Sequence, residues 1–84
     1  MTTDETSVLL EIQRIAARDL DVGRPLQATD RLIEDLGLDS LTLTTLAVAL
    51  EDHFRVTLSD EEAARVRTVG ELARCVASRA SGSS

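Results

Sequence analysis

One short segment of this sequence, Gly37-Leu38-Asp39-Ser40-Leu41, combines residue types and spacing that could support chemistry. Asp39 and Ser40 precede an apolar repeat of helical period, and such residues commonly cap a helix by accepting hydrogen bonds from free backbone N–H groups. The position also suits a covalent modification. A phosphodiester on the Ser40 hydroxyl would face unpaired N–H groups and the positive end of the helix dipole, an effect of roughly 0.3 to 1 kcal/mol. That is enough to tolerate the modification, but a separate transferase must install it.

No other residues assemble into a catalytic or metal-binding set. The single histidine, His53, is a surface or boundary residue at the end of the predicted helix, too far along it from Ser40 for a Ser-His-Asp triad. The single cysteine, Cys75, excludes an intrachain disulfide and multi-cysteine metal sites, and it is expected to pack as a small hydrophobic residue. The consecutive acids 60–62 point in different directions on a helix. The sequence therefore predicts neither an enzyme nor a metal site.

Charge divides the chain into an acidic middle and a basic end. The 84 residues carry a formal charge of −6, and every base is arginine. Residues 30–62 hold nine acids and two arginines, a net charge of −7, whereas residues 63–84 hold four arginines and one glutamate, a net charge of +3. This distribution argues against nucleic acid as a partner and favours proteins with basic docking patches. No apolar run reaches membrane-spanning length and no signal peptide is evident, so we expect a cytoplasmic monomer.

Hydrophobic periodicity predicts an all-α fold. The apolar spacing and the cap signals give helices over residues 8–20, 39–54, 59–66 and 68–78. Capping boxes, in which a hydroxyl is followed three residues later by Glu, mark the last two starts at Ser59 and Thr68. Inward-facing residues are expected at Leu43, Leu46, Ala47, Leu50, Phe54, Val69, Leu72, Ala73 and Val76, with Leu41 and Val48 more exposed.

A long loop is expected between the first two helices, over residues 21–38. Gly23, Pro25 and Gly37 interrupt the helical period there, with one short turn near 31–36. Aliphatic residues should hold this loop against the core: Leu26, Leu32, Ile33, Leu36 and Leu38. The predicted architecture is a small four-helix bundle, with three main helices and a short third one. It forms a single domain over 1–84, with an ordered core of about 6–79 and a flexible tail, 80–84.

Over nearly its whole length the sequence resembles bacterial acyl carrier proteins. The resemblance is carried by Asp35-Leu-Gly-Leu-Asp-Ser-Leu41, Leu46-Ala-Val-Ala-Leu-Glu-Asp-His-Phe54, Ser59-Asp-Glu-Glu-Ala63 and Thr68-Val69. It implies that Ser40 receives 4′-phosphopantetheine from coenzyme A, and that Asp39 assists the phosphopantetheinyl transferase, whose site uses Mg²⁺. It further implies that Leu41 docks into acyl-loading, ketosynthase and other synthase enzymes, and that Val48, Glu51 and Asp52 extend the same docking face.

The sequence departs from this family where carriers of fatty acid synthesis typically have acids, two and five positions after the modified serine. Here those positions are Thr42 and Thr45. Since charge steers association and partner choice, the departure indicates a specialised carrier. The all-arginine basic set and the high alanine content are typical of a GC-rich genome, so we expect polyketide, hybrid peptide or specialised fatty acid biosynthesis. Two alternatives stay open. One is a peptidyl or aminoacyl carrier with the same arm, which the Asp before Ser40 and the acidic middle disfavour. The other is an unmodified helical adaptor in which Asp39 and Ser40 only cap a helix.

Overall fold

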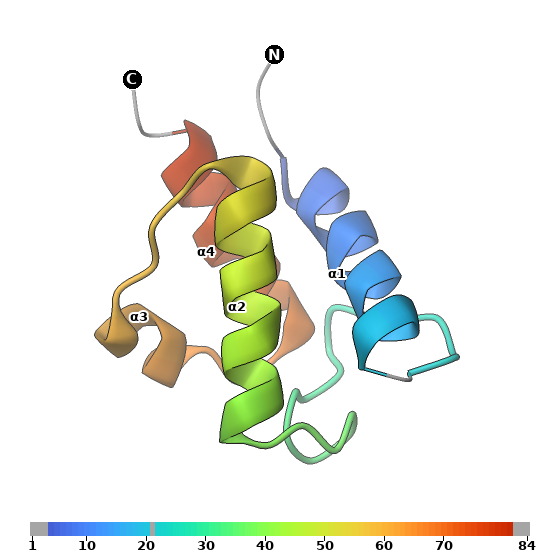
Figure 1. Cartoon of the computed structure of the whole chain (residues 1–84). Helices are drawn as coiled ribbons and strands as arrows, with labels where there is room; N and C mark the ends of the chain where they lie inside the picture. The colour runs from blue at the N-terminus through green and yellow to red at the C-terminus, as the bar shows by residue number, and fades with distance from the viewer. Residues whose placement is uncertain (1–3, 21, 82–84) are drawn as a thin grey trace.

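A computed structural model describes residues 4–20 and 22–81 of the chain. It contains four helices, α1 (Glu5–Asp19), α2 (Ser40–Phe54), α3 (Asp60–Arg65) and α4 (Val69–Ser81), shown in Figure 1. The described residues form no strand, and their one β-type contact is an isolated bridge between Arg31 and Thr68. The predicted all-α fold, with three main helices, a short third helix and a long loop, is confirmed.

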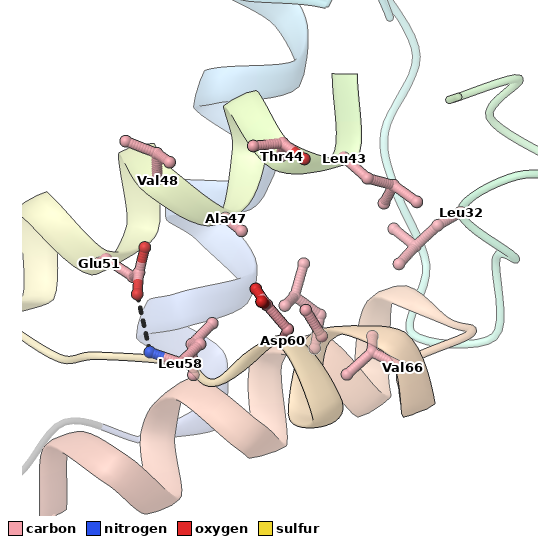
Figure 2. Close-up of a pocket in the computed structure, with 11 residues that line it drawn as sticks. Leu32, Leu43, Thr44, Ala47, Val48, Glu51, Leu58, Asp60 and Val66 are labelled. Carbon is pink, nitrogen blue, oxygen red and sulfur yellow. Dashed lines mark hydrogen bonds between the residues drawn. The ribbon is translucent and has the colours of Figure 1, made fainter. Parts of the chain in front are cut away.

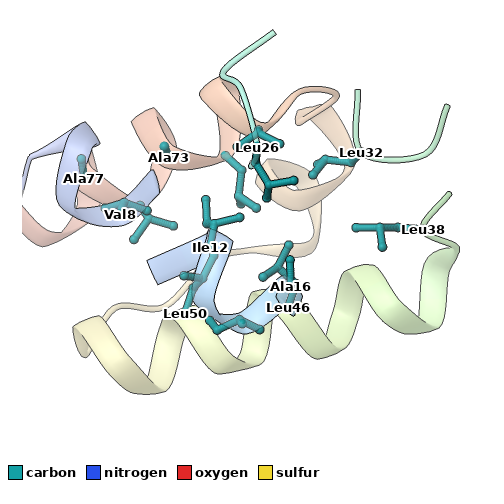
Figure 3. Packing of buried hydrophobic residues seen from close by; sticks show 14 residues of the cluster. Val8, Ile12, Ala16, Leu26, Leu32, Leu38, Leu46, Leu50, Ala73 and Ala77 are labelled. Atoms are coloured by element: carbon teal, nitrogen blue, oxygen red, sulfur yellow. The ribbon is translucent and has the colours of Figure 1, made fainter. Parts of the chain in front are cut away.

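Helices α1, α2 and α4 pack against one another, while α3 lies beside α2 and away from α1 (Figure 1). Their contact encloses an aliphatic core, part of which Figure 3 shows. The buried apolar residues are Val8, Ile12, Ile15, Ala16, Leu26, Leu32, Leu38, Leu46, Leu50, Val69, Leu72, Ala73, Val76 and Ala77. Burial of this apolar surface stabilises the fold at roughly 25 cal/mol per Å². The core therefore rests on the three long helices and the loop.

Two helix ends differ from the prediction. Helix α1 begins before Val8 because the Asp4 carboxylate accepts a hydrogen bond from the Ser7 N–H (2.8 Å) and caps the first turn. Helix α4 continues to Ser81, three residues beyond the predicted end at residue 78. The start of the predicted flexible tail is thus helical, and residues 82–84 lie outside the described residues.

The loop between α1 and α2 is held to the core as predicted, except at Ile33. Leu26, Leu32 and Leu38 are buried and Leu36 is partly buried, but Ile33 is 59% exposed. A single helical turn explains the difference, because the N–H groups of Asp35 and Leu36 both donate to the Arg31 carbonyl. Side chains four residues apart on such a turn share a face, whereas adjacent ones diverge by about 100°. Ile33 therefore points outward.

Backbone hydrogen bonds tie this loop to the start of α4. The N–H groups of Val69 and Gly70 donate to the carbonyls of Asp30 and Ala28, each at 2.9 Å. These bonds satisfy N–H groups that a helix start leaves without helical partners. The loop backbone at Ala28 lies close to the helix backbone at Gly70, since a Cβ on Gly70 would lie 2.9 Å from the Ala28 carbonyl oxygen. Glycine at position 70 lets the loop that leads to α2 lie directly on α4.

Candidate functional site

The start of α2 is capped by Asp39. Its carboxylate accepts a hydrogen bond from the Thr42 N–H (2.9 Å), and the Thr42 hydroxyl oxygen accepts one from the Asp39 N–H (2.8 Å). The hydrogen bond from the Thr42 backbone is the main reason why the pKa of Asp39 lies below its ordinary value. Of the two residues expected to cap this helix, Asp39 does so, and Ser40 is the first residue inside it.

The capping carboxylate changes one expectation from the sequence. An anion on Ser40 was expected to meet unpaired backbone N–H groups, but Asp39 already accepts from Thr42 and its carbonyl accepts from the Leu43 N–H (2.9 Å). A negative group therefore already occupies the positive end of the helix. The helix end offers less stabilisation to an added phosphodiester than the sequence alone suggests.

Ser40 lies exposed at this helix end. Within residues 4–20 and 22–81, no hydrogen bond engages its hydroxyl, so the oxygen carries no structural role that a modification would break. Gly37, three residues earlier, has a positive φ of 72°, which favours glycine, and a Cβ there would meet nothing within 4 Å. The approach to Ser40 along this loop is open.

The face of α2 that follows Ser40 is mostly apolar. Leu41 is 72% exposed and Val48 55% exposed, as predicted. Between them, the Thr45 hydroxyl donates to the Leu41 carbonyl (3.0 Å), and the neighbouring Thr44 hydroxyl donates to the Ser40 carbonyl (2.8 Å). Both hydroxyl protons are therefore used within the helix. This face therefore offers methyl groups to a partner.

The two acids expected on this docking face lie differently. Asp52 is exposed, whereas Glu51 is half-buried and accepts a hydrogen bond from the Leu58 N–H (2.7 Å), drawn as a dashed line in Figure 2. Glu51 thus fastens the segment that leads from α2 to α3. Of these two acids, only Asp52 presents a carboxylate that does not take part in fastening this segment.

An apolar pocket of about 190 Å³ lies between α2 and α3. Figure 2 shows apolar side chains from both sides of it. Its apolar lining includes Leu43, Ala47, Val48, Leu58, Ala63 and Val66. The partial exposure of Leu43 and Ala47, both expected to face inward, follows from their place on this pocket. Thr44, one helical turn after Ser40, is on its rim, so the pocket opens close to the candidate site.

The other reactive side chains lie away from Ser40. His53 is half exposed at the end of α2, with its Nδ1 3.6 Å from Glu11 of α1. Cys75 is half-buried on α4, where burial raises the pKa of its thiol, and its Sγ lies 3.8 Å from Glu62 Oε2. In the described part of the chain, no three metal-ligating side chains gather to hold an ion, and no helix is long and apolar enough to cross a membrane.

Sequence reasoning missed two polar arrangements around the site. The reciprocal cap of Asp39 and Thr42 has a signal in the sequence, an acid and a hydroxyl three residues apart at a helix start. The ion pair between Glu62 of α3 and Arg79 of α4 has none, because the two residues lie 17 positions apart. The capping boxes at Ser59 and Thr68 were predicted and are confirmed.

Comparison with known proteins points to one family. The family profile described as "Phosphopantetheine attachment site" matches residues 11–76. An acyl carrier protein of Wolinella succinogenes is 34% identical over 67 residues, 79% of this chain and 88% of the relative. The acyl carrier protein MbtL of Mycobacterium tuberculosis is 35% identical over 80 residues, 94% of this chain and 95% of the relative. The crystal structure of an acyl carrier protein from Thermotoga maritima shares the fold, with a TM-score of 0.80 at 24% identity, and the match covers 95% of this chain and 94% of that one.

Proposed function

Since this chain belongs to the acyl carrier proteins, a family that carries covalently attached 4′-phosphopantetheine, we propose that the attachment point is the hydroxyl of Ser40. Such proteins are carriers and not enzymes, and they work with a phosphopantetheinyl transferase and with synthases. One observation carries the proposal: Ser40 is the exposed first residue of α2, and its hydroxyl is free of hydrogen bonds within the described residues.

The residues around Ser40 fit a group that another protein must attach. Gly37 and the open space beside it leave room for the transferase, and Asp39 is available at the helix end as its contact. The Asp39 carboxylate remains ionised at neutral pH, because hydrogen bonds lower its pKa. We assign Asp39 a role in recognition by the transferase. The transferase catalyses attack of the Ser40 hydroxyl on coenzyme A, in which the phosphoanhydride bond breaks and adenosine 3′,5′-bisphosphate leaves.

The proposed cargo is an acyl group, held as a thioester on the terminal thiol of the arm. The pocket between α2 and α3 opens near Ser40 and has an apolar lining, which suits an acyl chain. An apolar cavity of about 150 Å³ accommodates a benzene-sized molecule, so the 190 Å³ here fits a chain of about six carbons before any helix moves. We place the carrier in polyketide, hybrid peptide or specialised fatty acid biosynthesis because Thr42 and Thr45 stand where carriers of fatty acid synthesis typically have acids.

Enzymes that load and unload the carrier are proposed to dock on the outer face of α2. Leu41 and Val48 supply apolar contact, with Asp39 and Asp52 as charged contacts at its two ends. Glu51 contributes less than the sequence suggests, because its carboxylate accepts from the Leu58 N–H. Loading and ketosynthase-type partners should therefore combine an apolar surface with basic groups placed to meet Asp39 and Asp52. We place this monomeric carrier in the cytoplasm, where a reducing milieu suits the free Cys75.

A peptidyl or aminoacyl carrier is the second candidate, because it would use the same arm at the same serine. The acidic residue before Ser40 and the net charge of −7 over residues 30–62 favour the acyl kind. Loading assays on the protein bearing the arm separate the two: an acyl carrier accepts acyl groups from loading enzymes, and a peptidyl carrier accepts aminoacyl groups from adenylating enzymes.

Incubation with coenzyme A and a broad-specificity phosphopantetheinyl transferase, followed by intact mass measurement, tests the attachment. The wild-type protein should gain the mass of one phosphopantetheine, and Ser40→Ala should gain none while keeping its helical circular dichroism. Ser78→Ala is the matched control, because it removes an exposed serine hydroxyl on α4. A wild-type protein that stays at its starting mass would favour the unmodified adaptor instead.

A further inference from the structure

Helix α3 forms one wall of the apolar pocket but is weakly anchored. None of its residues is buried, whereas each of the three other helices contributes buried apolar residues. Its apolar attachment comes from the segments that flank it, through Leu58 and Val66, which are only partly buried. Elements with little buried apolar surface open at low free-energy cost. What holds α3 in place must therefore be largely polar.

The main polar attachment is the ion pair between Glu62 of α3 and Arg79 of α4. Arg79 Nε donates to Glu62 Oε2 at 2.8 Å, and Arg79 Nη2 lies 2.5 Å from Glu62 Oε1. The same carboxylate accepts a hydrogen bond from the Ser59 N–H (3.1 Å), which caps α3. These contacts lower the pKa of Glu62 to about 2, and the hydrogen bond from Arg79 makes the largest contribution. Glu62 thus links the cap of α3 to α4 and stays charged at physiological pH.

We infer that the Glu62–Arg79 pair is a latch that limits how far α3 can move from α2, and so selects the acyl chain length that the pocket holds. The inference rests on the proposed carrier function. A two-pronged pair between arginine and a carboxylate fixes orientation as well as distance. Without Arg79, α3 keeps its apolar contacts at Leu58 and Val66 and the weak contact of Glu62 with Cys75 Sγ (3.8 Å), but it loses its charged link to α4. The pocket can then widen for longer chains.

A matched pair of variants isolates the latch. Arg79→Gln removes it, and Arg74→Gln removes another α4 arginine, whose contact is the exposed Glu5 (3.2 Å). In the protein without the arm, amide hydrogen exchange of residues 60–65 should be about fivefold faster in Arg79→Gln, the upper range for an exposed pair. Exchange in Arg74→Gln should match wild type. Arg79→Lys, which keeps the charge but not the two-pronged geometry, should fall between them.

The second measurement uses carriers loaded with a series of acyl chains. Chains inside a pocket are shielded from water, so their thioesters hydrolyse more slowly. Wild type should protect chains of up to about six carbons best, and Arg79→Gln should extend protection to longer chains.

Three results would overturn the latch. The first is that α3 exchanges at the same rate in Arg79→Gln and Arg74→Gln. The second is that Arg79→Gln accelerates exchange in α1 as much as in α3, which signals general destabilisation, and the third is that Arg79→Gln leaves the chain-length profile of thioester protection unchanged. Failure of the proposed function is distinguishable, because it appears as an unmodified Ser40, whereas the exchange experiment needs no arm.

Discussion

Helices α1 and α3 are held in the molecule in opposite ways. Helix α1 buries Val8, Ile12, Ile15 and Ala16 almost completely against α2 and α4, while α3 buries none of its residues and relies on Glu62 and on the cap at Ser59. Apolar burial is strong and non-directional, whereas exposed polar contacts are weak but geometrically specific. The molecule therefore has two parts: a firm half formed by α1, α2 and α4, which keeps the fold, and an adjustable half, α3 with its flanking segments, beside the candidate attachment site.

The largest expected effect lies in the firm half. Leu50→Ala removes a fully buried side chain of α2, and we expect a loss of about 2 to 5 kcal/mol in the free energy of unfolding. For a domain of this size, that approaches the whole stability. Urea unfolding followed by circular dichroism measures it.

The same substitution on the outer face of α2 provides the control. Leu41 is 72% exposed, so Leu41→Ala should change the free energy of unfolding by about 0.5 kcal/mol or less. Equal losses in the two variants would contradict the assignment of inner and outer faces.

A smaller effect is expected where the loop meets α4. Gly70→Ala places a Cβ 2.9 Å from the Ala28 carbonyl oxygen and strains the hydrogen bond between these residues. Overpacking costs about 1 to 3 kcal/mol, and alanine's higher helix propensity returns about 1 kcal/mol, so we expect a net loss of about 1 kcal/mol. Gly23→Ala, where a Cβ meets nothing within 4 Å, should be neutral or slightly stabilising. The thermal unfolding temperatures of both variants, compared with that of wild type, test these two expectations.

The adjustable half should respond to acid through Glu62. Its pKa of about 2 lies below the ordinary value of 4.5, so its contribution to stability is complete above about pH 4.5 and disappears as the pH falls towards 2. The difference in unfolding free energy between wild type and Glu62→Gln should therefore be constant at neutral pH and shrink between pH 4.5 and 2. A difference that is unchanged down to pH 2 would mean that the carboxylate does not hold α3 as a charged group.

The smallest effect on the fold, but a measurable one on docking, is expected on the outer face of α2. Thr42→Glu with Thr45→Glu restores the acids typical of carriers in fatty acid synthesis, and should speed use by fatty acid synthase enzymes several-fold at low salt. Helix capping should survive, since a glutamate at position 42 can accept the Asp39 N–H as Thr42 does. Thr45→Glu alone leaves the cap untouched and should give part of the gain. Unchanged rates in both variants would remove the argument from electrostatic steering.

The sequence predicts the firm half well because local rules determine it. Helical spacing located the buried residues of α4 other than Ala77, and the hydroxyl of Thr68 with Glu71 three residues later located the start of α4. The same signal at Ser59 located the start of α3, so local rules also find the boundary of the weakly anchored helix. The prediction that Ile33 packs against the core was wrong, because the orientation of this side chain depends on a single turn that the apolar pattern does not resolve. The Glu62–Arg79 pair, the close approach at Gly70 and the inward role of Glu51 depend on tertiary contacts, which short-range patterns do not contain.

The most direct test of the account is to map the modification on protein isolated from its native cell by peptide mass spectrometry. The account predicts phosphopantetheine on the peptide that contains Ser40, with an acyl group on the arm in part of the sample. Phosphopantetheine on a different residue, or a wholly unmodified Ser40, would contradict it.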